Sequence, residues 1–327
     1  MKKEKFFLLP KTVQDYLVYV EAVKGRSEKT VEQYANDLNI FFRYIVRYKG
    51  LYPASVSDDK IDLRTVDIEF IKTITLADVY QYVIWLKTVK KNNEATRTKR
   101  IVSIRRYFAY LEKNLLITYN PLKDIESPAL KKTKPKYLSK DEALLLLRSV
   151  DGKNKERDFA ILVLFLNCGM RLSELVGINI RDIDFDENKM TVIGKGNKER
   201  VIYLNKSCIN AIKDYLSSRP APSLIKRDSK NSEKALFLSE QKKRISNRTV
   251  QLIITKELEA ARLDTKKLSV HKLRHTAATL MYQYGNVDIR ALQELLGHES
   301  IATTEIYTHV SNDQVRSAVE NNPLANL

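Results

Sequence analysis

Two of the four histidines of this chain lie within the pentapeptide HKLRH, at His271 and His275, with Arg274 between them. On an α-helix, residues three and four apart share one face, so His271 and Arg274 can point at one target. A guanidinium presents five N–H donors in a fixed fork that matches phosphate, and an imidazole can exchange a proton near neutral pH. The pair suits a phosphodiester, although a solvated surface helix explains the pentapeptide equally well.

Zinc binding is another interpretation, since histidines at i and i+4 can share a metal ion. Such a site needs a third ligand and usually a glutamate base, as in HExxH, whereas Leu273 and Arg274 stand here. The two cysteines, Cys168 and Cys208, show neither CxxC nor zinc spacing, and Cys168 is expected to pack as a small hydrophobe in an apolar helix. We therefore predict no metal and no cofactor.

Two other segments offer cationic side chains. In CGMRLSELVGI (168–178), Gly169 ends an apolar helix and Arg171 stands where the next helix begins, with its side chain expected to project freely. In KGNKE, Lys195 lies at the tip of an expected β-hairpin, from which a lysine can reach a ligand held by the helical core.

The segment LLGHESIATTEIYTHV (295–310) contains a candidate nucleophile. Gly297 ends a helix and presents His298, and Tyr307 follows nine residues later. A free tyrosine has a pKa near 10, so only about one in a thousand is ionised at pH 7. A field of arginine, lysine and histidine charges favours the phenolate and stabilises the negative charge of a pentavalent phosphorus transition state.

Taken together, GMRLSEL, the hairpin lysine, HKLRH, LGHES and TTEIYTHV resemble the tyrosine recombinase (phage integrase-type) family, most closely its Xer branch. The likeness covers nearly all of residues 138–310. It implies an enzyme, a site-specific recombinase that cleaves and rejoins DNA through a 3′-phosphotyrosyl intermediate without metal or ATP. It also implies the Xer role in chromosome dimer resolution and segregation. An integrase or excisionase of a mobile element and a type IB topoisomerase-like relaxing enzyme stay as alternatives.

The resemblance carries over six active-site residues: Arg171, Lys195, His271, Arg274, His298 and Tyr307. The two arginines would clamp the scissile phosphate, and Lys195 would protonate the leaving 5′ oxygen. His271 would help to position the phosphate and exchange a proton with the nucleophile. His298 would donate to a non-bridging oxygen, and the tyrosine would be the nucleophile. His275 falls on a neighbouring helical face and is expected to be structural.

Hydrophobic periodicity predicts a mainly α fold with a small antiparallel β-sheet. Helices expected over 12–24, 27–48, 76–89 and 94–114 make residues 1–122 a helical domain. Its resemblance to the family's core-binding (SAM-like) domain implies that it binds DNA. A break at Gly50 and Pro53 separates the second helix from the third. Thr75 and Asp78 form a capping box ahead of the third helix.

A basic, proline-containing linker covers 123–137, and residues 138–327 form an α+β catalytic domain. Ser139 and Glu142 form its opening capping box. The expected elements are an apolar helix over 156–168, a hairpin of 190–194 and 200–204 that strand 235–238 joins, helices after Ser246, and a tail helix within 311–327.

The chain carries a net charge of +17, and 27 basic against 16 acidic residues lie in 1–137. Such an excess favours nucleic acid as the partner. The resemblance implies double-stranded DNA with a specific recombination site and a homo- or hetero-tetramer assembled on it. The tail 311–327 is a candidate for docking on a neighbouring protomer, with packing on its own domain as the alternative. A second recombinase or a DNA translocase is left open as a further partner. The expected DNA contacts are Arg97, Lys99, Arg100, Arg244 and Arg248.

No apolar run approaches the length of a membrane span, and the apolar part of the N-terminal MKKEKFFLLPK is too short for a signal peptide. The sequence therefore predicts a cytoplasmic protein without a membrane partner.

Overall fold

The structure is a computed structural model that describes residues 6–53, 55–123, 125, 136–194, 198–225, 228, 231–266, 268–285, 287–297 and 304. The chain divides into two compact units, Met1–Lys132 and Thr133–Leu327. Each unit has its own hydrophobic core.

In the described part of the N-terminal unit, all regular secondary structure is helical. Its elements are α2 (Lys11–Val18), the π-helical turn η1 (Tyr19–Val23), α3 (Glu28–Tyr48), the 3₁₀ turns η2 (Asp58–Lys60) and η3 (Leu63–Thr65), α4 (Ile68–Lys72), α5 (Leu76–Thr88) and α6 (Glu94–Lys113). The four predicted helices are present, and α4 is an additional short helix in the stretch after the predicted break. The capping box forms as expected, since the Thr75 amide donates to Asp78 at 2.8 Å and the Asp78 amide donates to Thr75 at 3.3 Å.

Aromatic side chains on α3, α5 and α6 fill the core of this unit. Phe41, Tyr82 and Phe108 are fully buried, and the Phe41 ring packs edge-on against the other two, with centroids 5.2 and 6.2 Å away. Polar contacts also reach into the core, where Ser103 donates to buried Asp37 at 2.8 Å. Burial of three such rings supplies much of the driving force that joins these helices.

The C-terminal unit combines helices with a small sheet. Its elements are α7 (Lys140–Arg148), α8 (Lys155–Cys168), α9 (Leu172–Gly177), η4 (Ile180–Asp182), β1 (Ile183–Asp184), β2 (Lys189–Ile193), β3 (Glu199–Tyr203), α10 (Lys206–Ser218), η6 (Pro222–Leu224), α11 (Asn247–Ala260), α12 (Val270–Tyr284) and α13 (Ile289–Leu296). The predicted mainly α fold with a small antiparallel sheet is confirmed, and Ser139 and Glu142 form the predicted capping box.

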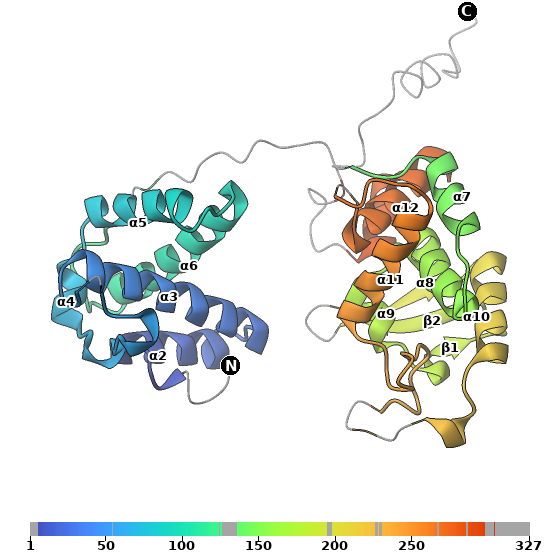
Figure 1. The fold of residues 1–327 in the computed structure, drawn as a ribbon, viewed down its shortest axis with the longest axis horizontal. Coiled ribbons are helices and arrows are strands. Elements are labelled where there is room, and N and C mark those ends of the chain that lie inside the picture. The colour runs from blue at the N-terminus through green and yellow to red at the C-terminus, as the bar shows by residue number, and fades with distance from the viewer. Residues whose placement is uncertain are drawn as a thin grey trace, which may run out of the picture. The chain divides into compact units, whose positions relative to one another are not determined.

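Helix α8 is the centre of this unit and packs against α7, α10 and α12 (Figure 1). Residues 160–166 are all buried, so this stretch of the helix is apolar around its whole circumference. Cys168 at its end is 2% exposed and packs in the core, as predicted, with its sulfur 3.8 Å from that of Cys208 on α10. Gly169 then ends the helix in the left-handed conformation, with a φ of 56°.

The sheet has the strand order β1–β2–β3, and both pairs of strands are antiparallel. The hairpin of β2 and β3 matches the prediction. The third strand was predicted wrongly: it is the two-residue β1, whereas residues 235–238 make only isolated bridges, from Ala235 to Asn179 and from Leu238 to Arg244. A strand as short as β1 has no periodicity of its own, because it exists only through its partner.

No helix within the described ranges is both long enough and apolar enough to cross a membrane.

Candidate active site

The structure describes three of the six predicted catalytic residues, Arg171, His271 and Arg274. Lys195 at the hairpin tip, His298 and Tyr307 lie outside the described residues, as does the predicted tail helix. The structure does describe the elements that lead to Lys195 and to His298. Strands β2 and β3 flank the hairpin turn, and α13 ends at Leu296, immediately before Gly297 and residue 298.

Arg171 occupies the N-cap of α9, two residues after Gly169. Its backbone amide donates to Glu174 Oε2 at 2.7 Å, and its Nη1 donates to Glu174 Oε1 at 2.8 Å. Its Nη2 donates to the carbonyl oxygen of Gly297 at 2.7 Å. The side chain is therefore held from two sides, and the expectation that it projects freely is wrong. Two of the five N–H donors of its guanidinium are engaged by these partners.

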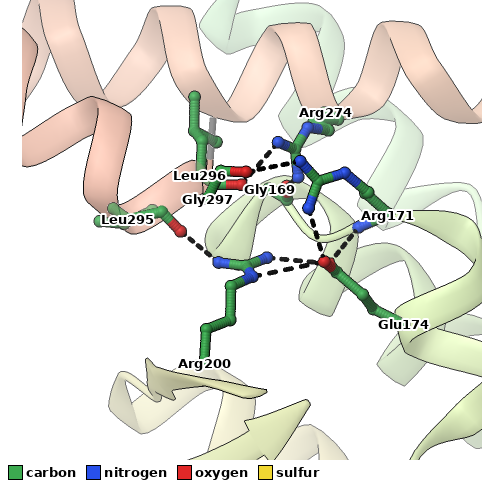
Figure 2. Close-up of polar contacts among 8 residues, drawn as sticks. All are labelled: Gly169, Arg171, Glu174, Arg200, Arg274, Leu295, Leu296 and Gly297. Atoms are coloured by element: carbon green, nitrogen blue, oxygen red, sulfur yellow. Dashed lines mark hydrogen bonds and ion pairs between the residues drawn. The ribbon is translucent and has the colours of Figure 1, made fainter. Parts of the chain in front are cut away.

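Arg274 lies on the buried face of α12, with 6% of its surface exposed. Its Nη1 donates to the Gly169 carbonyl at 2.6 Å and its Nη2 to the Leu296 carbonyl at 2.7 Å (Figure 2). A buried guanidinium needs such partners because removing it from water is costly. Arg274 therefore joins the end of α8 to the end of α13.

Two residues that sequence reasoning did not assign complete the cluster. Glu174 on α9 has a fully buried carboxylate, and Arg200 on β3 pairs with it, with Nη2 2.8 Å from Oε2 and Nε 3.3 Å from Oε1 (Figure 2). Burial by itself would raise the pKa of the Glu174 carboxyl, but hydrogen bonds and charge from Arg200 and Arg171 outweigh burial and lower that pKa below its usual value. Glu174 thus stays ionised between two guanidinium groups.

The three arginines converge on the last turn of α13. Arg200 donates to the carbonyl of Leu295, Arg274 to that of Leu296 and Arg171 to that of Gly297. The C-terminal carbonyls of a helix have no partners within the helix and carry partial negative charge, so cations stabilise them. The chain leaves this cationic cluster directly into residue 298.

Glycine is required at both turns of the cluster. Gly169 and Gly297 have φ angles of 56° and 64°. A Cβ on Gly169 would lie 2.9 Å from Leu296 Cδ2, and one on Gly297 would lie 3.0 Å from Arg200 Cδ. The positive φ angles and the close approaches explain why both helices end in glycine.

The two histidines of HKLRH differ in environment. His271 is exposed near the start of α12, whereas His275 is half-buried. Burial lowers the pKa of His275 to about 4, assisted by the charges of Lys272, His271 and Arg274. His275 is therefore neutral at pH 7, and its structural role stays a prediction.

The expected DNA contacts also differ in exposure. Lys99 and Arg248 are exposed, while Arg97 and Arg100 are half-buried and Arg97 donates to the Asn92 carbonyl at 2.7 Å. Arg244 donates to the carbonyls of Val176, Gly177 and Ile178 and to Asn179 Oδ1 at 2.6 Å. Its guanidinium therefore fastens the end of α9.

Comparison with known proteins identifies the class. The profile of the phage integrase family matches residues 136–314, and the chain belongs to this family, the tyrosine recombinases. Among its relatives is the tyrosine recombinase XerC of Caldanaerobacter subterraneus subsp. tengcongensis, 49% identical over 317 residues that cover 97% of this chain and 88% of that protein. XerC of Thermodesulfovibrio yellowstonii is 33% identical over 300 residues, 91% of each chain. The prediction of an Xer-type tyrosine recombinase is confirmed.

A solved structure shares the fold. The XerH site-specific recombinase bound to a palindromic difH substrate, in its post-cleavage complex, aligns over 98% of this chain and 97% of that chain. The TM-score is 0.68 and the sequence identity is 19%. At this identity the likeness concerns the fold alone.

Proposed function

We propose that this recombinase cleaves and rejoins DNA strands with Tyr307 as the nucleophile, and that it resolves chromosome dimers as an Xer enzyme. The observation that carries the proposal is the convergence of Arg171 and Arg274, 103 positions apart in the sequence, on the consecutive carbonyls of Leu296 and Gly297. The relatives named XerC favour this role over that of a mobile-element integrase or excisionase.

Each charge in the cluster has a task in the proposed reaction. Arg171 and Arg274 bind the non-bridging oxygens of the scissile phosphate. The Tyr307 oxygen attacks phosphorus, the P–O5′ bond breaks, and Lys195 donates a proton to the leaving oxygen. His271 exchanges a proton with the nucleophile, and His298 donates to a non-bridging oxygen. The 3′-phosphotyrosyl bond conserves the energy of the phosphodiester, so rejoining requires no ATP.

The electrostatics support this assignment. The described side chains Arg171, Arg200, Arg274 and Glu174 sum to two positive charges around the α13 end. A preorganised cationic site lowers the energy of a phosphorane-like transition state without reorganisation during the reaction. Placement of Tyr307 beside this site would favour its phenolate in the same way.

DNA binding rests on the basic surface of both units. We assign phosphate contacts to Lys99 and Arg248, which are exposed, and treat Arg97 and Arg100 as secondary candidates. The structure of XerH with difH provides a precedent for DNA binding by this fold. Assembly of four protomers on DNA, homo- or hetero-tetrameric, is part of the proposal, with docking of the tail 311–327 on a neighbouring protomer.

A nicked suicide substrate tests the assignment of the nucleophile. Wild-type protein should accumulate a covalent protein–DNA complex without metal, and Tyr307→Phe should accumulate none. Tyr284→Phe is the matched control, because Tyr284 is 68% exposed on α12 and should trap DNA like wild type. Trapping that survives Tyr307→Phe, or that depends on metal, refutes the proposal.

A second assay distinguishes a recombinase from a type IB topoisomerase-like relaxing enzyme. Purified protein is offered a supercoiled plasmid with one or two copies of its recombination site. Strand exchange that needs paired sites supports the recombinase role. Relaxation of a plasmid without paired sites would identify a type IB topoisomerase-like enzyme instead.

A further inference from the structure

Arg200, like Arg171, joins Glu174 to the end of α13. Its side chain is 13% exposed and contacts both Glu174 and the end of α13. It forms the two hydrogen bonds to Glu174 described above, and its Nη1 donates to the Leu295 carbonyl. A two-point contact between guanidinium and carboxylate is the strongest and most directional pairing available to these groups.

The register of the sheet explains why Arg200 points inward. It pairs with Val192 across the hairpin, and its side chain lies on the same face as that of Ile202, which is buried. Glu199 and Val201, one position to either side, are exposed. Because side chains alternate along a strand, a shift of one residue would turn Arg200 to solvent.

Arg200 also changes the electrostatics of Arg171. Without Arg200, the buried Glu174 carboxylate would be paired with Arg171 alone, and the charge of Arg171 would be largely neutralised. With Arg200 present, one carboxylate is shared by two guanidinium groups and a net positive charge remains. Arg171 thus keeps the capacity to attract an anion.

The same side chain connects three elements mechanically. Strand β3 leads back to the hairpin turn with Lys195, Glu174 lies on α9 beside Arg171, and Leu295 lies three residues before His298. The aliphatic part of Arg200 also packs against Gly297, where a Cβ would approach its Cδ to 3.0 Å.

We propose that Arg200 is a positioning residue for the cleavage reaction: it shares Glu174 with Arg171 and fixes the β2–β3 hairpin to the end of α13. Arg200 itself does not contact the scissile phosphate. This inference rests on the proposed function, since it takes Arg171 as a phosphate ligand.

Single-turnover cleavage of the suicide substrate tests the proposal. Arg200→Met should slow cleavage by about 100-fold, because a displacement of about 1 Å in a reacting group costs that much. Affinity for DNA should stay within twofold of wild type. Arg200→Lys keeps the charge but loses the two-point contact, and its rate should lie between wild type and Arg200→Met. Arg181→Met, with a 78% exposed side chain on the same unit, is the control and should cleave like wild type.

A double variant separates positioning from a direct phosphate contact. In Arg200→Met, an unshared Glu174 neutralises Arg171; Glu174→Gln removes that negative charge. We therefore expect Arg200→Met with Glu174→Gln to cleave faster than Arg200→Met alone. A direct phosphate contact or a purely structural role predicts losses that multiply in the double variant, and that result would overturn the inference.

The outcomes distinguish this inference from the proposed function. If Tyr307→Phe still forms the covalent complex, the assignment of the nucleophile fails, whatever Arg200 does. If Tyr307→Phe is inactive and Arg200→Met cleaves at the wild-type rate, only the inference fails. Thermal unfolding identifies variants that do not fold. If Arg200→Met is one of them, the neutral but polar Arg200→Gln takes its place, with and without Glu174→Gln, and the same rescue is expected.

Discussion

Arg171 and Arg274 donate to the carbonyl oxygens of consecutive residues, and both distances are 2.7 Å: Arg171 to Gly297 and Arg274 to Leu296. The two guanidinium groups come from the start of α9 and from α12 and are brought together by the end of α13. Any displacement of α13 therefore moves both cations and the chain that leads to residue 298.

Replacement of Arg274 by lysine should harm both stability and catalysis. One ammonium cannot span the carbonyls of Gly169 and Leu296, and a buried carbonyl without a donor costs about 1–3 kcal/mol. Cleavage should fall by about 10²–10³, the usual effect of losing one transition-state donor. Urea unfolding and single-turnover cleavage measure the two effects. Arg290→Lys, at an exposed position on α13, should change neither, and wild-type stability of Arg274→Lys would contradict the account of the buried contacts.

Alanine at Gly169 should destabilise the C-terminal unit. A non-glycine residue in the left-handed conformation costs about 1–2 kcal/mol, and here the new methyl also meets Leu296. The control is Gly177→Ala, since Gly177 has no positive φ and no heavy atom within 4 Å of the added Cβ; as a helical residue it should gain up to about 1 kcal/mol.

Circular dichroism follows the urea unfolding of both variants. Trp85, the single tryptophan, lies in the N-terminal unit, and its fluorescence should report the same unfolding midpoint in the two variants. A Gly169→Ala protein as stable as wild type would show that Leu296 and the turn adapt without cost.

Alanine substitutions of two arginines near the start of α11 should affect different properties, DNA binding for Arg248 and stability for Arg244. Arg248 is exposed, so Arg248→Ala should weaken DNA binding, reduce the slope of log K against log salt by about 1, and leave unfolding unchanged. Arg244→Ala should lower the free energy of unfolding, because the carbonyls at the end of α9 lose their donor. Fluorescence anisotropy at several salt concentrations provides the slopes. An unchanged slope in Arg248→Ala would remove this residue from the DNA interface.

Stability should depend on pH through His275. The unfolded chain takes up a proton at His275 below about pH 6.5, while the folded chain does so only near pH 4. Between these values the unfolded state binds more protons, so the free energy of unfolding rises with pH, by at most about 1.4 kcal/mol per pH unit for one proton, and reaches its full value above pH 6.5.

Replacement of His275 tests this assignment. Urea unfolding from pH 4 to 7 should show a smaller slope in His275→Gln than in wild type. Equal slopes in the two proteins would show that His275 titrates normally in the folded state.

The sequence by itself determined the elements and the class of this protein. The main helices, the β2–β3 hairpin, both capping boxes and the glycine ends of α8 and α13 depend on residues within a few positions of one another, where periodicity and local hydrogen bonds decide the conformation. The motifs that indicated a tyrosine recombinase are also short and local. Their order along the chain carried the resemblance that the family match confirmed.

The tertiary structure alone decided how the cations are held. Glu174 and Arg200 lie 26 residues apart, and Arg274 and Gly169 lie 105 residues apart, so no local sequence pattern predicts either contact. The same holds for Arg244, which resembles a DNA contact in sequence but hydrogen-bonds to the end of α9, and for β1, which is a strand only because β2 pairs with it. Such partners are chosen by packing of the whole core, because burial of a charge is tolerated only where distant segments supply its hydrogen bonds.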